Sequence, residues 1–481
     1  MKKPRVRFAP SPTGDPHLGV IRTALFNWLF AKKEKGQFIL RIEDTDRERY
    51  QKGSVEKIME SLNWLGLTWD EGPFFQSERT ALYEKYVRRL LEKKKVYYCF
   101  CSRERLERLR LDQTAAKQPP RYDKKCLKLS PQEIEKNLKE KKPVVIRLNI
   151  PEQGTTHFTD LIRGKVVFQN KLLDDSILLK SDGFPTYHLA NVVDDYEMGI
   201  THVIRAEEWL PSTPKHILLY QALGLRPPHF AHLPLILGRD KKKLSKRHGA
   251  VSVLQYKKDG YLPETLINFL VLLGWNPKNN QEIFSSEVLV KNFSLEGINK
   301  AGAVFDLDKL NWLNGLYLRK KTPEELAVLG KDYLKKEYLA LAKAKNINLE
   351  KLWQTARERI ATLKEINTLC DFVFEEMAYD PALLIPQKGS RAATLNGLEI
   401  VKKKLLSLSD KEVDSPENLK KIFFDFIKKN GLKTGEVLWP FRVALSGKRT
   451  SPDVFDLISL FGRKKTLEKV DQAVSLLKQH L

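Results

Sequence analysis

The residues best suited to chemistry lie in a short loop near the N-terminus. The segment PSPTGDPHLGVIRTA, at residues 10–24, carries three prolines and two glycines between a predicted strand and a predicted helix. Backbone N–H groups and the positive end of a helix converge at such a junction and attract phosphate. His17 can donate a hydrogen bond to a phosphate or ribose oxygen, and Gly19 lets a nucleotide approach the backbone. A proline-rich turn with a surface histidine fits the same pattern, so this loop alone does not decide the chemistry.

A second candidate is the strongly basic segment DKKKLSKRHGA, at residues 240–250. It packs four lysines and one arginine around Ser245. Such a group of cations can stabilise a pentavalent phosphate and a departing pyrophosphate, and lysine serves as a mobile point charge. On charge alone, however, a solvated basic loop is the favoured interpretation.

The elements around the first loop predict a nucleotide-binding sheet. Residues 6–9 form a short apolar-alternating strand, a helix is expected over about 22–33, and the strand QFILRIED follows at 37–44. Strand, helix and strand with short connections imply a parallel pair joined by a right-handed crossover. This unit is the usual beginning of a doubly wound α/β sheet.

The character of the chain changes at residues 96–180, which we interpret as an insertion. This segment holds a basic loop with PPRYD and β-rich pieces such as PVVIRLNI and GKVVFQN. Three of the four cysteines fall here within 28 residues, too few for a disulfide scaffold but close enough to raise the question of a metal. Cys370, the fourth, lies in a helical apolar pattern and is expected in a core. The α/β pattern then resumes, and beyond the basic segment nearly all of the pattern is helical.

Composition points to a polyanionic partner. Lysine and arginine number 84 against 60 aspartates and glutamates, a formal net charge of +24. Counterion release would drive such a surface onto nucleic acid, although basic surfaces also serve solubility alone. The N-terminus MKKPRVRFAPSP lacks the apolar run of a signal peptide, and no stretch approaches the roughly 18 apolar residues of a membrane span. We therefore expect a cytoplasmic protein with no membrane partner.

Taken together, these strings resemble a known family. The His-x-Gly loop and KLSKR, at 243–247, resemble the HIGH and KMSKS signatures of class I aminoacyl-tRNA synthetases. The wider strings FAPSPTGDPHLG, RIEDTDR, YHLANVVDD, VIRAEEW and KLSKRHGA resemble, in order along the whole chain, glutamyl-tRNA synthetases of the bacterial type. Val20 stands where the generic signature has its final histidine, so no catalytic role falls on that position.

The resemblance implies which residues handle ATP. His17, Lys243 and Lys246 would be catalytic, and ATP would be a substrate accompanied by Mg²⁺. The implied ATP-binding set is Pro10, Ser11, Thr13, Gly14, His17, Gly19, Glu208, Ile236, Lys243, Leu244, Ser245, Lys246 and Arg247.

An amino-acid pocket is implied as well. Its members would be Arg7, Ala9, Ser11, Glu43, Tyr187, Asn191 and Arg205. Glutamate has two carboxylates and one ammonium, and Arg7, Arg205 and Glu43 are a matching set of charges. Which arginine takes which carboxylate stays open. Without the resemblance, the acidic run at 43–46 suits a magnesium site or, preferably, an acidic helix start.

For the insertion, the resemblance implies a zinc knob. Cys99, Cys101 and Cys126 would be ligands, with Tyr122 as the candidate fourth, since Lys128 stands where some relatives have a histidine. Three reduced cysteines in a small core are the alternative. In the C-terminal part, Arg357 and Arg359 match positions near the anticodon, although two arginines on a helix also suit a solvated face.

The expected fold is an α/β, doubly wound parallel-sheet (Rossmann-like) catalytic domain with an α+β insertion, followed by an all-α C-terminal region. The expected segments are 1–95 and 181–240 for the catalytic domain, 96–180 for the acceptor-binding insertion, 241–322 for a helical stem-contact region and 323–481 for the anticodon-binding domain.

The implied reaction is that of a glutamate–tRNA ligase. Glutamate would attack the α-phosphate of ATP to give glutamyl-adenylate and pyrophosphate, and the 3′-terminal ribose of tRNA(Glu) would then take the acyl group. The second candidate tRNA is tRNA(Gln), and a monomer is expected. Three alternatives remain: a glutaminyl-tRNA synthetase, a nucleotidyl transferase that needs no RNA, and a non-catalytic RNA-binding homologue.

Overall fold

The computed structural model describes residues 3–244 and 251–479. The chain divides into two compact units: Met1–Gln255 with Leu266–Asp306, and Tyr256–Thr265 with Leu307–Leu481. The first unit carries the α/β part and the insertion, and the second is helical. The chain passes between the units within α8 (Val253–Asp259) and again within α9 (Pro263–Leu272).

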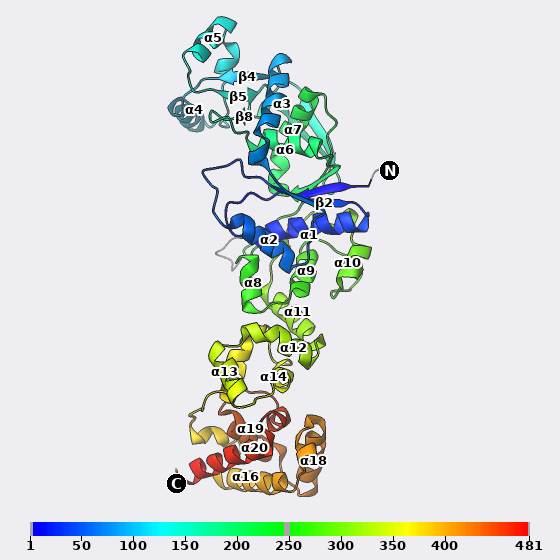
Figure 1. Ribbon diagram of the computed structural model, residues 1–481, viewed down its shortest axis with the longest axis vertical. Helices are drawn as coiled ribbons and strands as arrows, with labels where there is room; N and C mark the ends of the chain where they lie inside the picture. The colour runs from blue at the N-terminus through cyan, green and yellow to red at the C-terminus, as the bar shows by residue number, and fades with distance from the viewer. Residues whose placement is uncertain (1–2, 245–250, 480–481) are drawn as a thin grey trace. The chain divides into compact units, whose positions relative to one another are not determined.

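A parallel three-stranded sheet begins the first unit. Strand β1 (Arg5–Phe8) pairs with β2 (Gln37–Ile42), and β2 pairs with β3 (Glu71–Phe75). Five of the six residues of β2 are buried, as expected for a strand covered on both faces. Helices α1 (Leu18–Lys33) and α2 (Ser54–Trp64) lie on one side of β2, and α3 (Thr80–Glu92) lies on the other (Figure 1). The predicted strand–helix–strand unit is confirmed.

The boundaries of that unit differ from the prediction by a few residues. The first strand is Arg5–Phe8 rather than 6–9, and α1 begins at Leu18 rather than near residue 22. The helix starts early because the His17 side chain caps it, accepting a hydrogen bond from the Gly19 N–H. Periodicity of apolar residues does not reveal a cap of this kind.

A second, mixed sheet extends the α/β core, with strand order β7-β6-β10-β9. Strands β9 (His202–Ala206) and β10 (His229–Leu233) run parallel, and β6 (Thr155–Asp160) joins β10 where Asp160 pairs with Phe230. The two sheets meet where the Thr201 N–H donates to the Arg5 carbonyl at 2.9 Å. Helices α6 (Tyr187–Glu197) and α7 (Thr213–Leu223) pack on α3.

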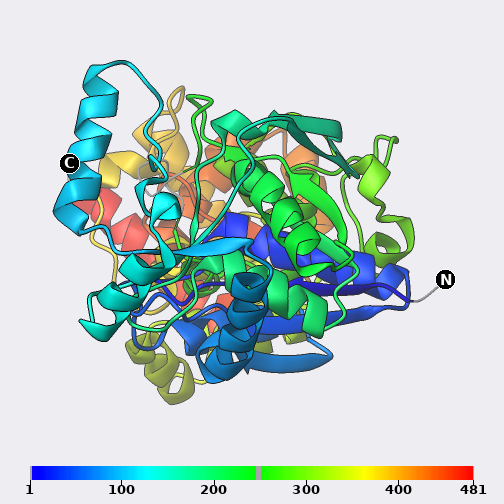
Figure 2. The same ribbon diagram turned by 90° about the horizontal axis from the view of Figure 1, so that it is seen from above.

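The segment interpreted as an insertion contributes to two sheets. Its antiparallel sheet has the order β4-β5-β8, with strands Val96–Cys99, Val145–Leu148 and Ile177–Leu179. Its other hairpin, β6 with β7 (Gly164–Gln169), belongs to the sheet of β9 and β10. Helices α4 (Arg103–Ala115) and α5 (Pro131–Lys139), in cyan, lie at one edge of the first unit (Figures 1 and 2).

Buried aliphatic and aromatic side chains connect the strands of the first unit to α3, α6 and α7. Among them are Ile39, Tyr83, Leu189, Val203 and Phe230, all at most 3% exposed. Burial of each large apolar side chain contributes about 1.5–3 kcal/mol. The strand ends that carry polar side chains are therefore held on a rigid frame. Among its described residues this unit also has β11 (Ile236–Leu237), α10 (Ser286–Asn292) and β12 (Ala303–Val304).

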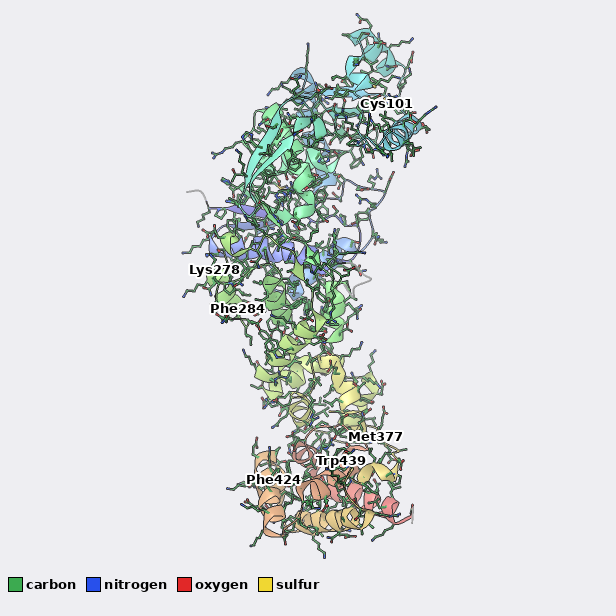
Figure 3. All side chains as sticks on the ribbon, turned by 180° about the vertical axis from the view of Figure 1, so that it is seen from behind. Cys101, Lys278, Phe284, Met377, Phe424 and Trp439 are labelled. Atoms are coloured by element: carbon green, nitrogen blue, oxygen red, sulfur yellow. The ribbon has the colours of Figure 1, made fainter. Side chains whose placement is uncertain are left out.

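The second unit is built of helices around its own core. They are α11 (Leu307–Lys320), α12 (Pro323–Gly330), α13 (Lys336–Ala344), α14 (Leu349–Ala356), α15 (Ile366–Leu369), α16 (Arg391–Leu406), α17 (Asp410–Val413), α18 (Pro416–Lys429), α19 (Thr434–Ser446) and α20 (Val454–Gln479). Met377 and Trp439, labelled in Figure 3, pack against this core. Helix α20 is interrupted at Gly462, whose φ of +72° suits glycine. No helix among the described residues is long and apolar enough to cross a membrane.

Candidate active site

His17 caps the helix that follows the predicted phosphate loop. Its Nδ1 accepts a hydrogen bond from the Gly19 N–H at 3.2 Å. A Cβ at Gly19 would lie 3.2 Å from the imidazole, so glycine gives the ring room to fold over the helix end. Because Nδ1 accepts, the neutral ring carries its proton on Nε2. Desolvation and the charge of Lys243 lower the pKa of His17, so the ring is neutral at neutral pH and keeps one donor.

Lys243 and Glu208 lie beside His17 and form an ion pair. The Leu244 N–H donates to the carbonyl of Ile236 at 2.9 Å, which holds the start of the basic segment against strand β11. The Lys243 side chain is 57% exposed, so its ammonium is free to exchange Glu208 for an anionic ligand. The other predicted residues of this segment lie outside the described residues: Ser245, Lys246 and Arg247.

The rest of the predicted phosphate loop follows β1 directly. It contains Ala9, Pro10, Ser11, Thr13 and Gly14. The Pro10 carbonyl accepts a hydrogen bond from the Glu43 N–H at 3.0 Å, which ties this loop to the end of β2. Because parallel strands end at the same edge of a sheet, Pro10 and Glu43 become neighbours although they lie far apart in the sequence.

A buried ionic network surrounds Arg7 and Glu43. Arg41 donates to Glu43 at 3.1 Å and to Asp195 at 2.8 Å, and Arg7 donates to Asp195 at 3.1 Å. These four side chains are at most 7% exposed, and the Asn191 amide lies 3.5 Å from Glu43. Burial disfavours the charged form of Asp195, but Arg7 and Arg41 outweigh it and lower its pKa. Burial raises the pKa of Glu43 despite the same arginines, so Glu43 gains most from an incoming ammonium group.

Arg205, in the same unit, is a buried cation whose guanidinium is held by neutral hydrogen-bond partners. Its guanidinium donates to Tyr187 Oη at 2.8 Å, to Thr213 Oγ1 at 2.9 Å and to His232 Nε2 at 3.1 Å. The residue is only 4% exposed, and no carboxylate of the described residues lies within ion-pair distance of it. A desolvated charge without a counterion is costly, and an anionic ligand relieves that cost.

Several residues that shape this site were not identified from the sequence. The strings RIEDTDR and YHLANVVDD contain Arg41 and Asp195. These two charged residues stood within the motifs, but the sequence indicated no role for them. His216, whose ring lies 3.4 Å from Arg205, comes just after a helix start, and no sequence motif marks its position. Asp160 and His232 also lie outside every motif, so the sequence contained no signal for them.

The three cysteines of the insertion meet in space. The sulfur atoms of Cys99, Cys101 and Cys126 all lie within 4.8 Å of one another, and two of them are 3.5 Å apart. Thiolates at about 2.3 Å from a tetrahedral Zn²⁺ require sulfur separations of this order. A hydrogen bond from Cys126 lowers the pKa of Cys99 to about 4 against the opposing effect of burial, so one thiolate forms readily. The residues present therefore fit a zinc ion.

Tyr122 adjoins this cluster in a different way. Its hydroxyl lies 3.5 Å from Cys99 Sγ and 3.4 Å from Cys101 Sγ, and it accepts from the Cys126 N–H at 3.0 Å. Burial and the neighbouring thiols raise its pKa, which keeps the phenol protonated. The Arg147 guanidinium lies 4.2 Å from the centre of its ring.

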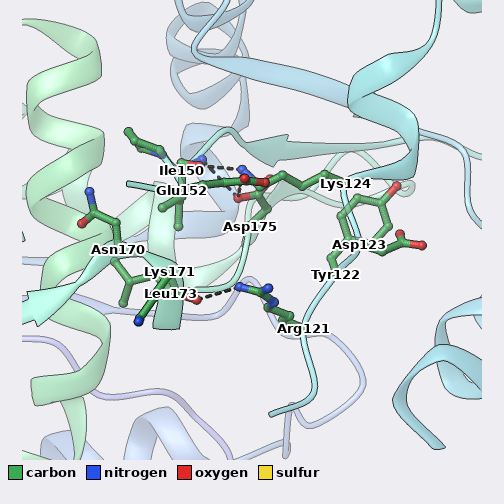
Figure 4. Close-up of a pocket in the computed structure, with 11 residues that line it drawn as sticks. Arg121, Tyr122, Asp123, Lys124, Ile150, Glu152, Asn170, Lys171, Leu173 and Asp175 are labelled. Atoms are coloured by element: carbon green, nitrogen blue, oxygen red, sulfur yellow. Dashed lines mark hydrogen bonds and ion pairs between the residues drawn. The ribbon is translucent and has the colours of Figure 1, made fainter. Parts of the chain in front are cut away.

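A pocket lies beside this tyrosine, as Figure 4 shows. Lys124 crosses it to donate to the Ile150 carbonyl at 2.6 Å and to approach Asp175 at 3.4 Å. Arg121 donates to the Lys171 carbonyl at 2.7 Å. These bonds join the cysteine segment to the β5 end and to the residues before β8. Cys101 itself is labelled in Figure 3.

The two arginines predicted near an anticodon lie at the end of α14 in the second unit. Arg357 pairs with the adjacent Glu358 at 3.5 Å, and Arg359 is exposed. Arg442 lies 5.0 Å from the ring of Trp439, and burial together with the charge of Arg359 lowers its pKa. A group of arginines beside an aromatic ring can bind phosphates and stack on bases.

Comparisons with known proteins show similarity over the whole chain. The family model for the catalytic domain of class I tRNA synthetases (E and Q) matches residues 3–312, and a model for an anticodon binding domain matches residues 325–474. A glutamate–tRNA ligase of Dehalococcoides mccartyi is 47% identical, with 99% of this chain and 98% of the relative covered. One of Thermodesulfovibrio yellowstonii is 45% identical, with 98% and 99% covered.

Solved structures show the same likeness. The crystal structure of a glutamate tRNA ligase from Elizabethkingia meningosepticum, in complex with its amino acid, superposes with a TM-score of 0.86 at 36% identity. The match covers 98% of this chain and 99% of that one. On the strength of these full-length similarities, the chain belongs to the family of class I tRNA synthetases of the E and Q type.

Proposed function

We propose that this protein is a glutamate–tRNA ligase. It activates L-glutamate with ATP, releases pyrophosphate and transfers the glutamyl group to the 3′ end of tRNA(Glu). The observation that carries this proposal is Arg205, a buried guanidinium with no carboxylate partner among the described residues. The relatives named above are glutamate–tRNA ligases that match this chain over nearly their full length, and they support the same activity.

The charges of the pocket are complementary to glutamate. In our proposal Arg205 receives the side-chain carboxylate, with the Tyr187 hydroxyl beside it. Glu43 and Asn191 receive the ammonium, and the Nη groups of Arg7, whose Nε is engaged by Asp195, receive the α-carboxylate. Glutamine in the same pocket would leave the charge of Arg205 unpaired, so the arrangement favours glutamate.

Activation needs positioning and charge more than acid–base chemistry. The His17 Nε2–H and the N–H groups at the start of α1 would donate to the phosphates. Lys243, together with Lys246 beyond the described residues, would stabilise the negative charge of the pentavalent phosphate and of pyrophosphate. Mg²⁺, which accompanies ATP, neutralises phosphate charge when it is bound.

The remaining assignments extend this proposal to the other parts of the chain. Cys99, Cys101 and Cys126 would hold a structural zinc, with Tyr122, whose hydroxyl lies 3.5 Å from Cys99 Sγ, as the candidate fourth ligand. Segments 96–180 and 241–322 would contact the acceptor end and the stem of the tRNA, and 323–481 the anticodon through Arg357 and Arg359. We also propose that the enzyme works as a monomer in the cytoplasm.

The test is ATP–pyrophosphate exchange with glutamate or glutamine, with and without purified tRNA, followed by charging of separate tRNA species. The proposal requires exchange that depends on glutamate and formation of glutamyl-tRNA(Glu). Exchange that prefers glutamine, or ATP turnover that ignores tRNA and amino acid altogether, contradicts it. Charging of tRNA(Gln) in the same assay decides whether that tRNA is a second substrate.

A further inference from the structure

A chain of buried side chains runs from Arg205 back to a strand of the insertion. Arg205 Nε donates to His232 Nε2 at 3.1 Å, and His232 Nδ1 lies 2.6 Å from Asp160 Oδ2. The side chains of His232 and Asp160 are both fully buried. The three residues come from β9, β10 and β6, which are adjacent strands of one sheet.

The partners determine which nitrogen of His232 carries the proton. The guanidinium Nε–H of Arg205 can only donate, so His232 Nε2 must accept. The proton of the neutral ring is then on Nδ1, where the Asp160 carboxylate accepts it. Burial lowers the pKa of His232 to about 4 in spite of Asp160, which keeps the ring neutral at neutral pH. Asp160 is ionised, since hydrogen bonds from His232 and the Arg163 backbone outweigh burial and lower its pKa.

Asp160 is itself held rigidly. Its Oδ1 accepts hydrogen bonds from the backbone N–H groups of Ile162 and Arg163, at 3.0 and 2.8 Å, in the turn between β6 and β7. The Arg163 side chain holds this turn further. It pairs with Glu207, and its Nη1 donates to the Lys300 carbonyl at 2.7 Å. One carboxylate oxygen therefore accepts from backbone N–H groups, that of His232 at 3.4 Å included, and the other accepts from the His232 ring.

We propose that Asp160 and His232 are positioning residues that orient the Arg205 guanidinium towards the side-chain carboxylate of the amino-acid substrate. The inference rests on the proposed function, because it assumes that Arg205 receives that carboxylate. His232 engages Nε and leaves Nη1 directed to Tyr187, at the side where a ligand would bind. Since Asp160 lies beyond His232, it stabilises Arg205 without neutralising it by direct contact. An anchor of this kind preserves the positive charge for the substrate.

The variant Asp160→Asn tests directly whether Asp160 orients Arg205 through His232. The asparagine is nearly the same size, and its carbonyl can keep the two backbone bonds of the turn. Its amide then faces His232 Nδ1 as a donor, which moves the ring proton to Nε2, against the Nε–H of Arg205. We expect the KM for glutamate in ATP–pyrophosphate exchange to rise by about tenfold to a hundredfold, with the KM for ATP unchanged. Discrimination against glutamine falls by a similar factor.

A matched control separates positioning from general damage. Asp175 is another buried carboxylate of the insertion, 2% exposed and bonded to Tyr97 at 2.6 Å, and it does not contact Arg205. Asp175→Asn should lower the melting temperature to a similar degree but leave the KM for glutamate unchanged. An equal rise in the KM values for glutamate and ATP in Asp160→Asn, or an equal effect of Asp175→Asn, overturns the positioning role.

A double variant gives a second, independent readout. Arg205→Lys keeps a cation but has no Nε donor, so His232 cannot orient it. In this background Asp160→Asn should change the KM for glutamate less than twofold, whereas a merely structural effect would appear in full. If the wild-type enzyme does not activate glutamate, the proposed function fails. If it does and Asp160→Asn leaves the KM for glutamate unchanged, only the positioning role fails.

Discussion

At the residue scale, burial decides which charges of the pocket are available to a ligand. Asp195 is satisfied by two arginines, whereas Glu43 and Arg205 are the least compensated anion and cation. Desolvated groups of this kind bind an ion of opposite charge far more strongly than exposed ones. In the proposed function these two groups would select a substrate that carries both an ammonium and a carboxylate.

Removal of the Arg205 guanidinium should abolish the preference for glutamate. In Arg205→Ala the substrate carboxylate loses its buried partner, which typically costs about 2–5 kcal/mol, or roughly 30- to several-thousand-fold in kcat/KM. Exchange kinetics with glutamate and glutamine measure the effect, and the KM for ATP should stay near the wild-type value. The control is Arg226→Ala, which removes an exposed arginine just after α7. Full discrimination in the Arg205 variant would show that another residue reads the carboxylate.

At the scale of single elements, two local structures have testable consequences. They are the start of helix α20 and the cysteine turn of the insertion, which carries Cys99, Cys101 and Cys126. Burial, together with Asp453 and Glu417, raises the pKa of Asp456 in α20 to about 6. The unfolded chain loses this proton near pH 4, so the folded state binds more protons between about pH 4 and 6. Stability therefore falls as the pH rises through this window.

Replacement of Asp456 by asparagine should relieve that cost. We expect Asp456→Asn to raise the melting temperature at pH 7.5 by a few degrees, equivalent to at most about 3 kcal/mol, and to change little at pH 4. Calorimetry at the two pH values measures the difference. Asp425→Asn, on the exposed face of α18, serves as the control and should have no such effect. A gain of the same size at both pH values would rule out titration of Asp456 as the cause.

The cysteine turn should carry metal in the purified protein. Protein isolated without chelator is expected to contain about one zinc per chain, because three sulfur atoms already lie at ligand separations. Cys126→Ser should lose the metal, whereas Cys370→Ala, in the core of the second unit, should keep it. Elemental analysis gives the ratio. A metal-free wild-type protein would mean that the three cysteines only pack a small core.

At the scale of the whole molecule, charge and chain length serve a polyanionic substrate. The net charge of +24 is spread over a chain that matches both a catalytic-domain and an anticodon-domain family. Phosphate contacts release counterions, so tRNA affinity should fall steeply as salt increases. In the second unit the half-buried Arg442 lies against the ring of Trp439, and the exposed Arg359 lies close enough to affect its charge, which suits contacts with unpaired bases.

The assignment of Arg357 and Arg359 to the anticodon predicts that replacing them changes only the KM for tRNA. Combined replacement of Arg357 and Arg359 by alanine should raise the KM for tRNA by about tenfold or more, which corresponds to about 1–3 kcal/mol. The KM values for glutamate and ATP should not change. Aminoacylation kinetics measure all three, with Lys420→Ala and Lys421→Ala on α18 as the control pair. An equal loss in both variants would indicate a general effect of basic charge.

Elements and chemistry that depend on local spacing could be predicted from the sequence. The strand–loop–helix around His17 and Gly19 follows from apolar periodicity and turn residues within about 35 positions, and the helical second unit from repeated 3.6-residue patterns. The family strings also indicated Arg7, Glu43 and Arg205 as a set. Tertiary structure alone decided how these charges are compensated. Asp160 and His232 are 72 residues apart and share no motif, yet adjacent strands place them 2.6 Å apart. Burial, which no local pattern specifies, then sets the proton positions and leaves Arg205 without a counterion.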